Sequence, residues 1–329
     1  RSSTMSTSRT REKADKLTFT QAEVTAKDTA ARAGRKNWII NGGFDVWQRG
    51  TTGAQPNSGF VADRWKGNNY ITGTLTFSQR TDATGQTFRT YGRLAQSSAG
   101  SNNSTQGIMQ YIEGLHLVGK TVTVSFKVRG NAALSGCKVR GIIAQQTFNL
   151  TTDWVKHSFT GTAIQDGSNT RLMFDWGLEN TTWHVDIAEV QVEVGSVATD
   201  FEHRSYGEEL RLCERYYQKL VGAYTQFSQI FNGHYNGTSQ IQGAYTYRTE
   251  MRNAPSLSYT STSSNNSSSA YAAAAGGAEV DFIDTLFLYN PSNLSTLIYT
   301  GTSTSGTAGH GANVYIQTTI TKLALVAEL

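Results

Sequence analysis

The sequence predicts a mainly β protein: an antiparallel β-sandwich, a linking α-helix and a second β-rich region, preceded by a short helical arm. Three observations predict it. The chain of 329 residues holds 32 Gly but 3 Pro, and only 16% of its residues are charged. Short runs of alternating apolar and polar residues, typical of half-buried strands, begin near Trp38 and recur to the C-terminus. Only one long run with helical spacing interrupts them, after Ser205.

We expect residues 1–36 to form an anchoring and oligomerisation arm. Thr20 and Glu23 have capping-box spacing, which predicts a helix over 21–33 that stops near Gly34. Its apolar face is thin, so we expect the helix to dock on a partner. The arm carries nine Lys/Arg and four Asp/Glu, which leaves 20 basic and 21 acidic residues beyond it. A nearly neutral body argues against a nucleic-acid partner.

We expect residues 37–204 to form the β-sandwich domain. The clearest strand is 121–128, where Val and Phe alternate with Thr, Ser and Lys. Along 185–194 the apolar positions change phase, which predicts a bulge near Ala188. Further strands are expected over 108–113, 138–144, 154–161 and 171–176, an even spacing that suits a sandwich.

We expect residues 205–329 to form a linking helix followed by a β-rich tip domain. Ser205 and Glu208 form a capping box, and Tyr206, Leu210, Cys213, Tyr217 and Leu220 recur at helical spacing. Strand-like alternation then returns and ends on 315–326, which could close a sheet. The uncharged stretch 260–278 is expected to form an exposed loop or edge.

Several function classes lack support in the residues. No apolar run reaches membrane-spanning length, and the first residues have no apolar core of a signal peptide. Cys137 and Cys213 are far apart and predict buried free thiols. Phosphate-loop, dinucleotide, HExxH and GxSxG motifs are missing, so we expect a protein that is not an enzyme and requires no cofactor.

Candidate site residues are of two kinds. Tryptophan and tyrosine rings offer the apolar faces with polar tips that sugars prefer. The candidates for stacking on a sugar are Trp65, Tyr70, Trp154, Trp176 and Trp183, although a sandwich normally buries some Trp, so about two of the five should be exposed. Asp175, Glu179 and Asp186 are the nearest candidates for a pair of catalytic acids, and ordinary strand-edge roles explain them better. His184 and Asp186 could bind a metal, but a structural pair is the commoner arrangement.

Three segments together resemble the tail-fibre and related receptor-binding proteins of bacteriophages. They are Asn41–Gly50 with Ala62–Trp65 (NGGFDVWQRG and ADRW), Val190–Gly195 (VQVEVG), and Ala198–Arg204 (ATDFEHR), which runs into Ser205–Leu210 and Glu214–Tyr217. The resemblance covers 37 to about 220. In the C-terminal part only Met251–Pro255 is similar to a segment of that family.

The resemblance implies a jelly-roll domain similar to carbohydrate-binding modules, in a homotrimer on a virion that is assembled in the host cytoplasm. Residues 1–36 would bind other virion proteins, and the fibre would bind host surface polysaccharide for adsorption, without nucleic acid or membrane insertion. Such jelly rolls often hold a structural Ca²⁺, and Asp45 and Glu189 match its ligand positions. Asp63 and Arg64 are expected to pair at the domain edge.

Two alternatives stay open. A head-fibre, decoration or adaptor protein would use the jelly roll mainly to pack against other virion proteins. A polysaccharide depolymerase would need catalytic acids for which the sequence offers no motif.

Overall fold

The computed structural model describes fourteen stretches of the chain, and the expected arm lies outside them except for Lys36. The described residues are 36–54, 59–68, 75–98, 107–113, 115–166, 170–176, 182–220, 229–237, 240–261, 270–274, 280–283, 286–300, 308–316 and 320–328.

The chain forms two compact units. Unit 1 comprises the described residues within Arg1–Phe44, Thr52–Gly59 and Trp65–His203, and unit 2 comprises those within Asp45–Thr51, Phe60–Arg64 and Arg204–Leu329. The placement of Asp45–Thr51 and Phe60–Arg64 in unit 2 differs from the sequence expectation, which assigned all of 37–204 to one domain. The side chains that tie them to unit 2 are described below.

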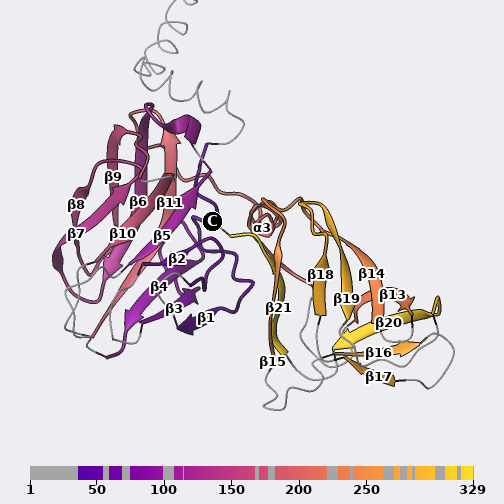
Figure 1. Ribbon diagram of the computed structural model, residues 1–329. Coiled ribbons are helices and arrows are strands. Elements are labelled where there is room, and N and C mark those ends of the chain that lie inside the picture. Colours follow the sequence, from indigo (N-terminus) through magenta and orange to yellow (C-terminus); the bar gives the residue numbers. More distant parts are fainter. Residues whose placement is uncertain are drawn as a thin grey trace, which may run out of the picture. The chain divides into compact units, whose positions relative to one another are not determined.

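Unit 1 is an antiparallel jelly-roll β-sandwich (Figure 1). In spatial order, its six-stranded sheet consists of β1 (Thr52–Ala54), β3 (Leu75–Arg80), β4 (Tyr91–Gln96), β11 (Trp183–Val194), β6 (Thr121–Gly130) and β9 (Val155–Thr162). Its five-stranded sheet consists of β2 (Lys66–Gly67), β5 (Ile108–Ile112), β10 (Thr170–Asp175), β7 (Leu134–Gly141) and β8 (Gln146–Leu150). A 3₁₀ turn, η1 (Leu115–Leu117), follows β5. From β4 onward the chain passes repeatedly between the two sheets, which is the jelly-roll connection.

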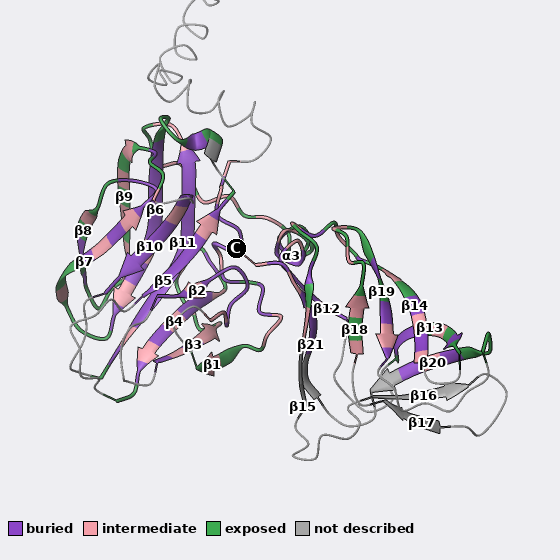
Figure 2. Ribbon diagram, in the orientation of Figure 1, coloured by how far each residue is buried: buried purple, intermediate pink, exposed green. Residues whose placement is uncertain are grey.

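Strand alternation builds the core of unit 1 and confirms the strand predicted over 121–128. In β6 the apolar positions Val122, Val124, Phe126 and Val128 are almost fully buried (Figure 2). Phe126 contacts Phe174 of the opposite sheet edge to face, at 4.9 Å between ring centroids. The strand predicted over 138–144 is displaced toward the N-terminus and ends at Gly141.

The predicted bulge is confirmed, because the pairing of β11 with β6 shifts between Ala188 and Gln191. Glu189 lies in this bulge with a φ of +50°. Gly42 packs against the same place: Val190 donates a backbone hydrogen bond to the Gly42 carbonyl at 3.0 Å. A Cβ on Gly42 would lie 2.1 Å from the Val190 carbonyl oxygen, so only glycine permits this approach.

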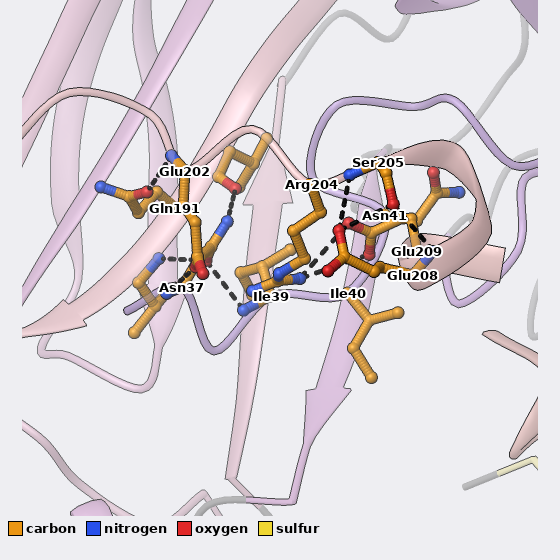
Figure 3. A network of polar contacts seen from close by, with 12 residues as sticks. Asn37, Ile39, Ile40, Asn41, Gln191, Glu202, Arg204, Ser205, Glu208 and Glu209 are labelled. Atoms are coloured by element: carbon orange, nitrogen blue, oxygen red, sulfur yellow. Dashed lines mark hydrogen bonds and ion pairs between the residues drawn. The ribbon is translucent and has the colours of Figure 1, made fainter. Parts of the chain in front are cut away.

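Asn37 anchors the start of unit 1 to β11 (Figure 3). Its side chain accepts hydrogen bonds from the backbone N–H groups of Ile39 (2.9 Å) and Val192 (3.1 Å) and donates to the Val190 carbonyl (3.0 Å). Its own backbone N–H donates to the Glu202 carboxylate. The segments 41–50, 190–195 and 198–204, singled out from the sequence, therefore adjoin a buried polar network that fixes the fold.

Unit 2 contains two antiparallel sheets. The three-stranded sheet consists of β12 (Tyr217–Lys219), β21 (Ile320–Val326) and β15 (Ser256–Ser261). The seven-stranded sheet consists of β17 (Val280–Ile283), β16 (Ala270–Ala274), β20 (Gly311–Ile316), β13 (Gln229–Asn236), β14 (Gln240–Thr246), β19 (Ser295–Thr300) and β18 (Leu286–Tyr289). Ile241, Ile298, Val314 and Leu325 are buried in one core cluster.

The linking helix forms as predicted at its start but is shorter than expected. α3 (Tyr206–Glu214) begins at the Ser205–Glu208 capping box, and Cys213 is buried. The prediction was wrong for Tyr206, which is exposed, and for Tyr217, which pairs with Val326 as part of β12. Pairing with β21 therefore overrides helical spacing after Glu214.

Two other sequence expectations for unit 2 need correction. The strand predicted over 315–326 is two strands, because β20 ends at Ile316 and β21 begins at Ile320. Within 260–278, expected to be a loop or edge, Ala270–Ala274 forms β16 between β17 and β20. Residues 262–269 and 275–279 lie outside the described residues.

Charged side chains tie the segments 45–51 and 60–64 to the C-terminal part of unit 2. Arg49 pairs with Asp63 (3.3 Å) and with Glu328 (2.7 Å), and Arg64 pairs with Glu328 (2.8 Å). The guanidinium of Arg49 lies 3.7 Å from the ring centroid of Tyr217. Asp63 and Arg64 were expected to pair with each other, but Asp63 pairs with Arg49 and Arg64 pairs with Glu328.

Candidate functional site

One outward surface of unit 1 combines aromatic and charged side chains. It covers the middle of the six-stranded sheet, where alternation turns one set of side chains away from the core. We call it the arginine–aromatic face, and it consists of Phe88, Tyr91, Arg93, Lys127, Arg129, Trp154, His184 and Asp186.

A buried carboxylate organises the centre of this face. Asp186 of β11 lies in register with Arg93 of β4 on one side and Arg129 of β6 on the other. Arg93 donates two hydrogen bonds to it, at 2.6 and 2.8 Å, and Arg129 donates one at 2.8 Å. The Asp186 side chain is fully buried, whereas those of Arg93 and Arg129 stay partly exposed. Asp186 thus holds two guanidinium groups in fixed positions at the surface.

An aromatic cluster lies beside these charges. Trp154 makes edge-to-face contacts with Phe88 and Tyr91, at centroid distances of 4.9 and 5.3 Å. The guanidinium of Arg129 lies 4.9 Å from the centroid of Trp154, within cation–π range. Phe88 and Tyr91 are buried, but Trp154 is half-buried. Trp154 therefore presents part of its indole ring to solvent next to Arg129.

The charged groups of this face form several pairs. Lys127 pairs with Glu189 at 2.9 Å, Arg93 and Arg129 share Asp186, and Asp82 accepts a hydrogen bond from Tyr91 at 2.7 Å. Burial lowers the pKa of His184, and the neighbouring Arg93 lowers it further. His184 is therefore a neutral imidazole at pH 7, with one donor and one acceptor nitrogen.

Four of the five aromatic residues predicted to stack on sugars lie in described stretches, and among these four Trp154 alone belongs to this face. The prediction was wrong for Trp65, Trp176 and Trp183, which are exposed by 0%, 1% and 5% and fill the core, so no ring face is available to a sugar. Trp65 stacks on Phe44 and donates to the Asn41 carbonyl at 2.9 Å. Tyr70 lies outside the described residues.

Sequence reasoning missed Arg93, Arg129 and Tyr91 as site residues. Strand alternation alone places each of them on one face of its own strand. What brings them to Asp186 is the order β4-β11-β6, which joins segments separated by as many as 93 residues. A signal was present in Asp186, an acid among apolar residues of a long strand, since a buried acid needs a cationic partner.

The residues do not fit the expected calcium site. Glu189 is paired with Lys127 and accepts a hydrogen bond from Thr87 at 3.1 Å, so its charge is already matched. Asp45 is exposed and belongs to unit 2. Among the residues with described positions, no three His, Cys, Asp or Glu side chains form a cluster that could hold a metal ion.

Two of the three candidate catalytic acids lie in described stretches, and they belong to different sheets. Asp175 lies in the five-stranded sheet, Asp186 lies in the six-stranded sheet, and Glu179 is outside the described residues. Asp186 pairs with two arginines.

Within the described segments no helix is long and apolar enough to cross a membrane.

Comparison with known proteins adds a likeness of fold. No protein-family model matches the sequence, and no curated protein matches it significantly. Solved structures with similar folds are mostly carbohydrate-binding modules. One is a CBM4 module, 23% identical, which covers 47% of this chain and 99% of its own, with a TM-score of 0.33.

Two other solved structures are similar to this chain at comparably low identity and TM-score. A CBM22 xylan-binding domain from Paenibacillus barcinonensis is 13% identical over 45% of this chain and 94% of its own, with a TM-score of 0.31. The enzymatically active domain of tailspike protein 4 from bacteriophage CBA120 is 11% identical over 48% of this chain and 21% of its own, with a TM-score of 0.32. At these values the likeness concerns the fold alone.

Proposed function

We propose that this protein binds a glycan through the arginine–aromatic face of unit 1, without cleaving it. The observation that carries the proposal is the half-buried Trp154 beside Arg129, one of two partly exposed guanidinium groups fixed by Asp186. An indole ring packs against the apolar face of a sugar, and fixed N–H donors bind its oxygens.

The fixed positions and the positive charge of the two arginines explain how such a face would discriminate between ligands. Arg93 and Arg129 are held by Asp186 before any ligand arrives, so little side-chain entropy is lost on binding. Because the two guanidinium groups of Arg93 and Arg129 share the single carboxylate of Asp186, a glycan with acidic groups gains a favourable charge interaction. We therefore propose an acidic surface polysaccharide as the ligand of this face.

The biological setting in the proposal is a bacteriophage fibre that attaches to a host-cell glycan. It rests on the sequence segments 41–50, 62–65, 190–195 and 198–204 and their resemblance to tail-fibre proteins. In this setting the chain is a homotrimer on the virion, and residues 1–36 bind other virion proteins. Three copies of one modest site would raise the avidity for a repeating polysaccharide.

The proposal is tested by incubating the full chain with surface polysaccharides extracted from a panel of bacterial strains. Binding is followed by tryptophan fluorescence, and cleavage by the release of reducing ends. Saturable binding to an acidic polysaccharide without release supports the proposal. Release of reducing ends would identify a depolymerase, and no binding to any extract would favour a structural virion protein.

A further inference from the structure

The seven-stranded sheet of unit 2 exposes a second surface with different chemistry. Its adjacent strands β18, β19, β14 and β13 contain no Asp, Glu, Lys or Arg. Alternation turns Leu286 and Leu288 toward the core and turns Phe287 and Tyr289 outward. Phe287 and Tyr289 are 39% and 51% exposed, which is unusual for large rings in a folded domain.

Three rings make a continuous row on this surface. Phe287 pairs in register with Tyr299, and their rings are nearly parallel, 13° apart with centroids separated by 5.7 Å. Tyr289 contacts the same Tyr299 ring at 5.4 Å. Ile298, the neighbour of Tyr299 on β19, is fully buried, so the strand that carries the row is anchored in the core.

Polar side chains continue the row across the sheet. Tyr299 lies in register with Gln242 of β14, which lies in register with His234 of β13. The side-chain nitrogens of Gln242 and His234 are 2.9 Å apart, within hydrogen-bonding distance. Amide and imidazole groups both donate and accept hydrogen bonds, as sugar hydroxyls do.

From this arrangement we infer that the outward face of β18, β19, β14 and β13 is a second glycan-binding site, specific for neutral sugars. The rings of Phe287, Tyr289 and Tyr299 stack on the sugar, and Gln242 and His234 bind its hydroxyls. The absence of charge on these strands selects the ligand. An acidic glycan, or a typical protein surface with about a quarter of charged residues, would bury charges that find no partner here.

This site is independent of the arginine–aromatic face, so the two can be tested separately. The full chain is titrated with neutral oligosaccharides of glucose, galactose and mannose, and with polygalacturonate as the acidic probe. The variants are Tyr289→Ala, Tyr289→Phe and, as a matched control, Leu294→Ala, which removes an exposed apolar side chain outside the row.

We expect at least one neutral oligosaccharide to bind, with an affinity about ten-fold lower in Tyr289→Ala and nearly unchanged in Tyr289→Phe and Leu294→Ala. Trp154→Ala should leave this binding intact. Failure of every neutral oligosaccharide to bind would overturn the inference without affecting acidic-glycan binding by unit 1. Sedimentation of each variant tests whether a second copy of this chain, instead of a glycan, binds the row. If Tyr289→Ala dissociates an oligomer and changes no glycan affinity, the row is an interface between copies of this chain.

Discussion

Trp154 and Asp186 perform different tasks on the arginine–aromatic face. Trp154 supplies a partly exposed ring that would contact a ligand directly. Asp186 is fully buried and acts through Arg93 and Arg129, which it holds at 2.6–2.8 Å. Substitutions at the two residues should therefore affect different measurements.

Replacing Trp154 should weaken glycan binding more than it weakens the fold. We expect Trp154→Ala to lower the affinity for an acidic polysaccharide about ten-fold, because the stacking surface beside Arg129 is lost. Trp154→Phe should retain an intermediate affinity. Thermal unfolding of each variant checks that unit 1 remains folded, and Ile164→Ala, at an exposed position outside the face, serves as the control. Equal affinities for Trp154→Ala and the native chain would contradict the assignment.

Replacing Asp186 should instead destabilise unit 1. The Asp186→Asn variant loses the charge that matches two guanidinium groups, and we expect a cost of about 2 kcal/mol, given that both arginines remain partly exposed. Urea unfolding measures it. Asp153→Asn, at an exposed acid of the same unit, should change the midpoint little. An Asp186→Asn midpoint equal to that of the native chain would show that the pairs contribute nothing.

At the scale of the elements, local patterns identified the strands that alternate and missed the pairings that join them. The strand over 121–128 and the bulge after Ala188 were predictable because burial imposes a period of two on the sequence. The end of α3 was not, because Tyr217 fits helical spacing equally well and only its pairing with Val326 decides its structure. The candidate site depends on the strand order in the same way, so the sequence singled out Trp154, His184 and Asp186 but not Arg93 and Arg129, which pair with Asp186.

The contact between Gly42 and the bulge of β11 gives a prediction at this scale. A Cβ at residue 42 would meet the Val190 carbonyl oxygen at 2.1 Å, which must displace either the first segment or the bulge. We expect Gly42→Ala to cost about 2 kcal/mol or more in the free energy of unfolding. Gly207→Ala in α3, where a Cβ meets nothing within 4 Å, is the matched control and should be neutral or slightly stabilising. A destabilisation no larger than that of the control would contradict the close approach.

For the whole molecule, the buried charges of unit 2 predict how stability depends on pH. Burial raises the pKa of Asp63 to about 6, with Arg49 opposing the shift, against 3.8 for an ordinary Asp. Between these values the folded chain holds a proton that the unfolded chain releases, so this group makes the fold more stable as the pH falls from about 6 to about 4. The shift corresponds to about 3 kcal/mol.

The Asp63→Asn variant isolates that contribution. Its free energy of unfolding, measured by urea titration from pH 7 to pH 4, should lack the increase toward low pH that Asp63 gives the native chain. The difference between the two profiles is the quantity to compare, because other groups titrate equally in both proteins. Parallel profiles would show that Asp63 keeps an ordinary pKa in the folded protein.

Glycan binding on the arginine–aromatic face should slow hydrogen exchange of the backbone amides beneath it. The full chain is compared with and without the acidic polysaccharide that the strain panel identifies. We predict slower exchange in β4, β6, β11 and the segment around Trp154. Protection confined to the five-stranded sheet of unit 1 or to unit 2, or no polysaccharide-dependent protection anywhere, would contradict glycan binding on this face.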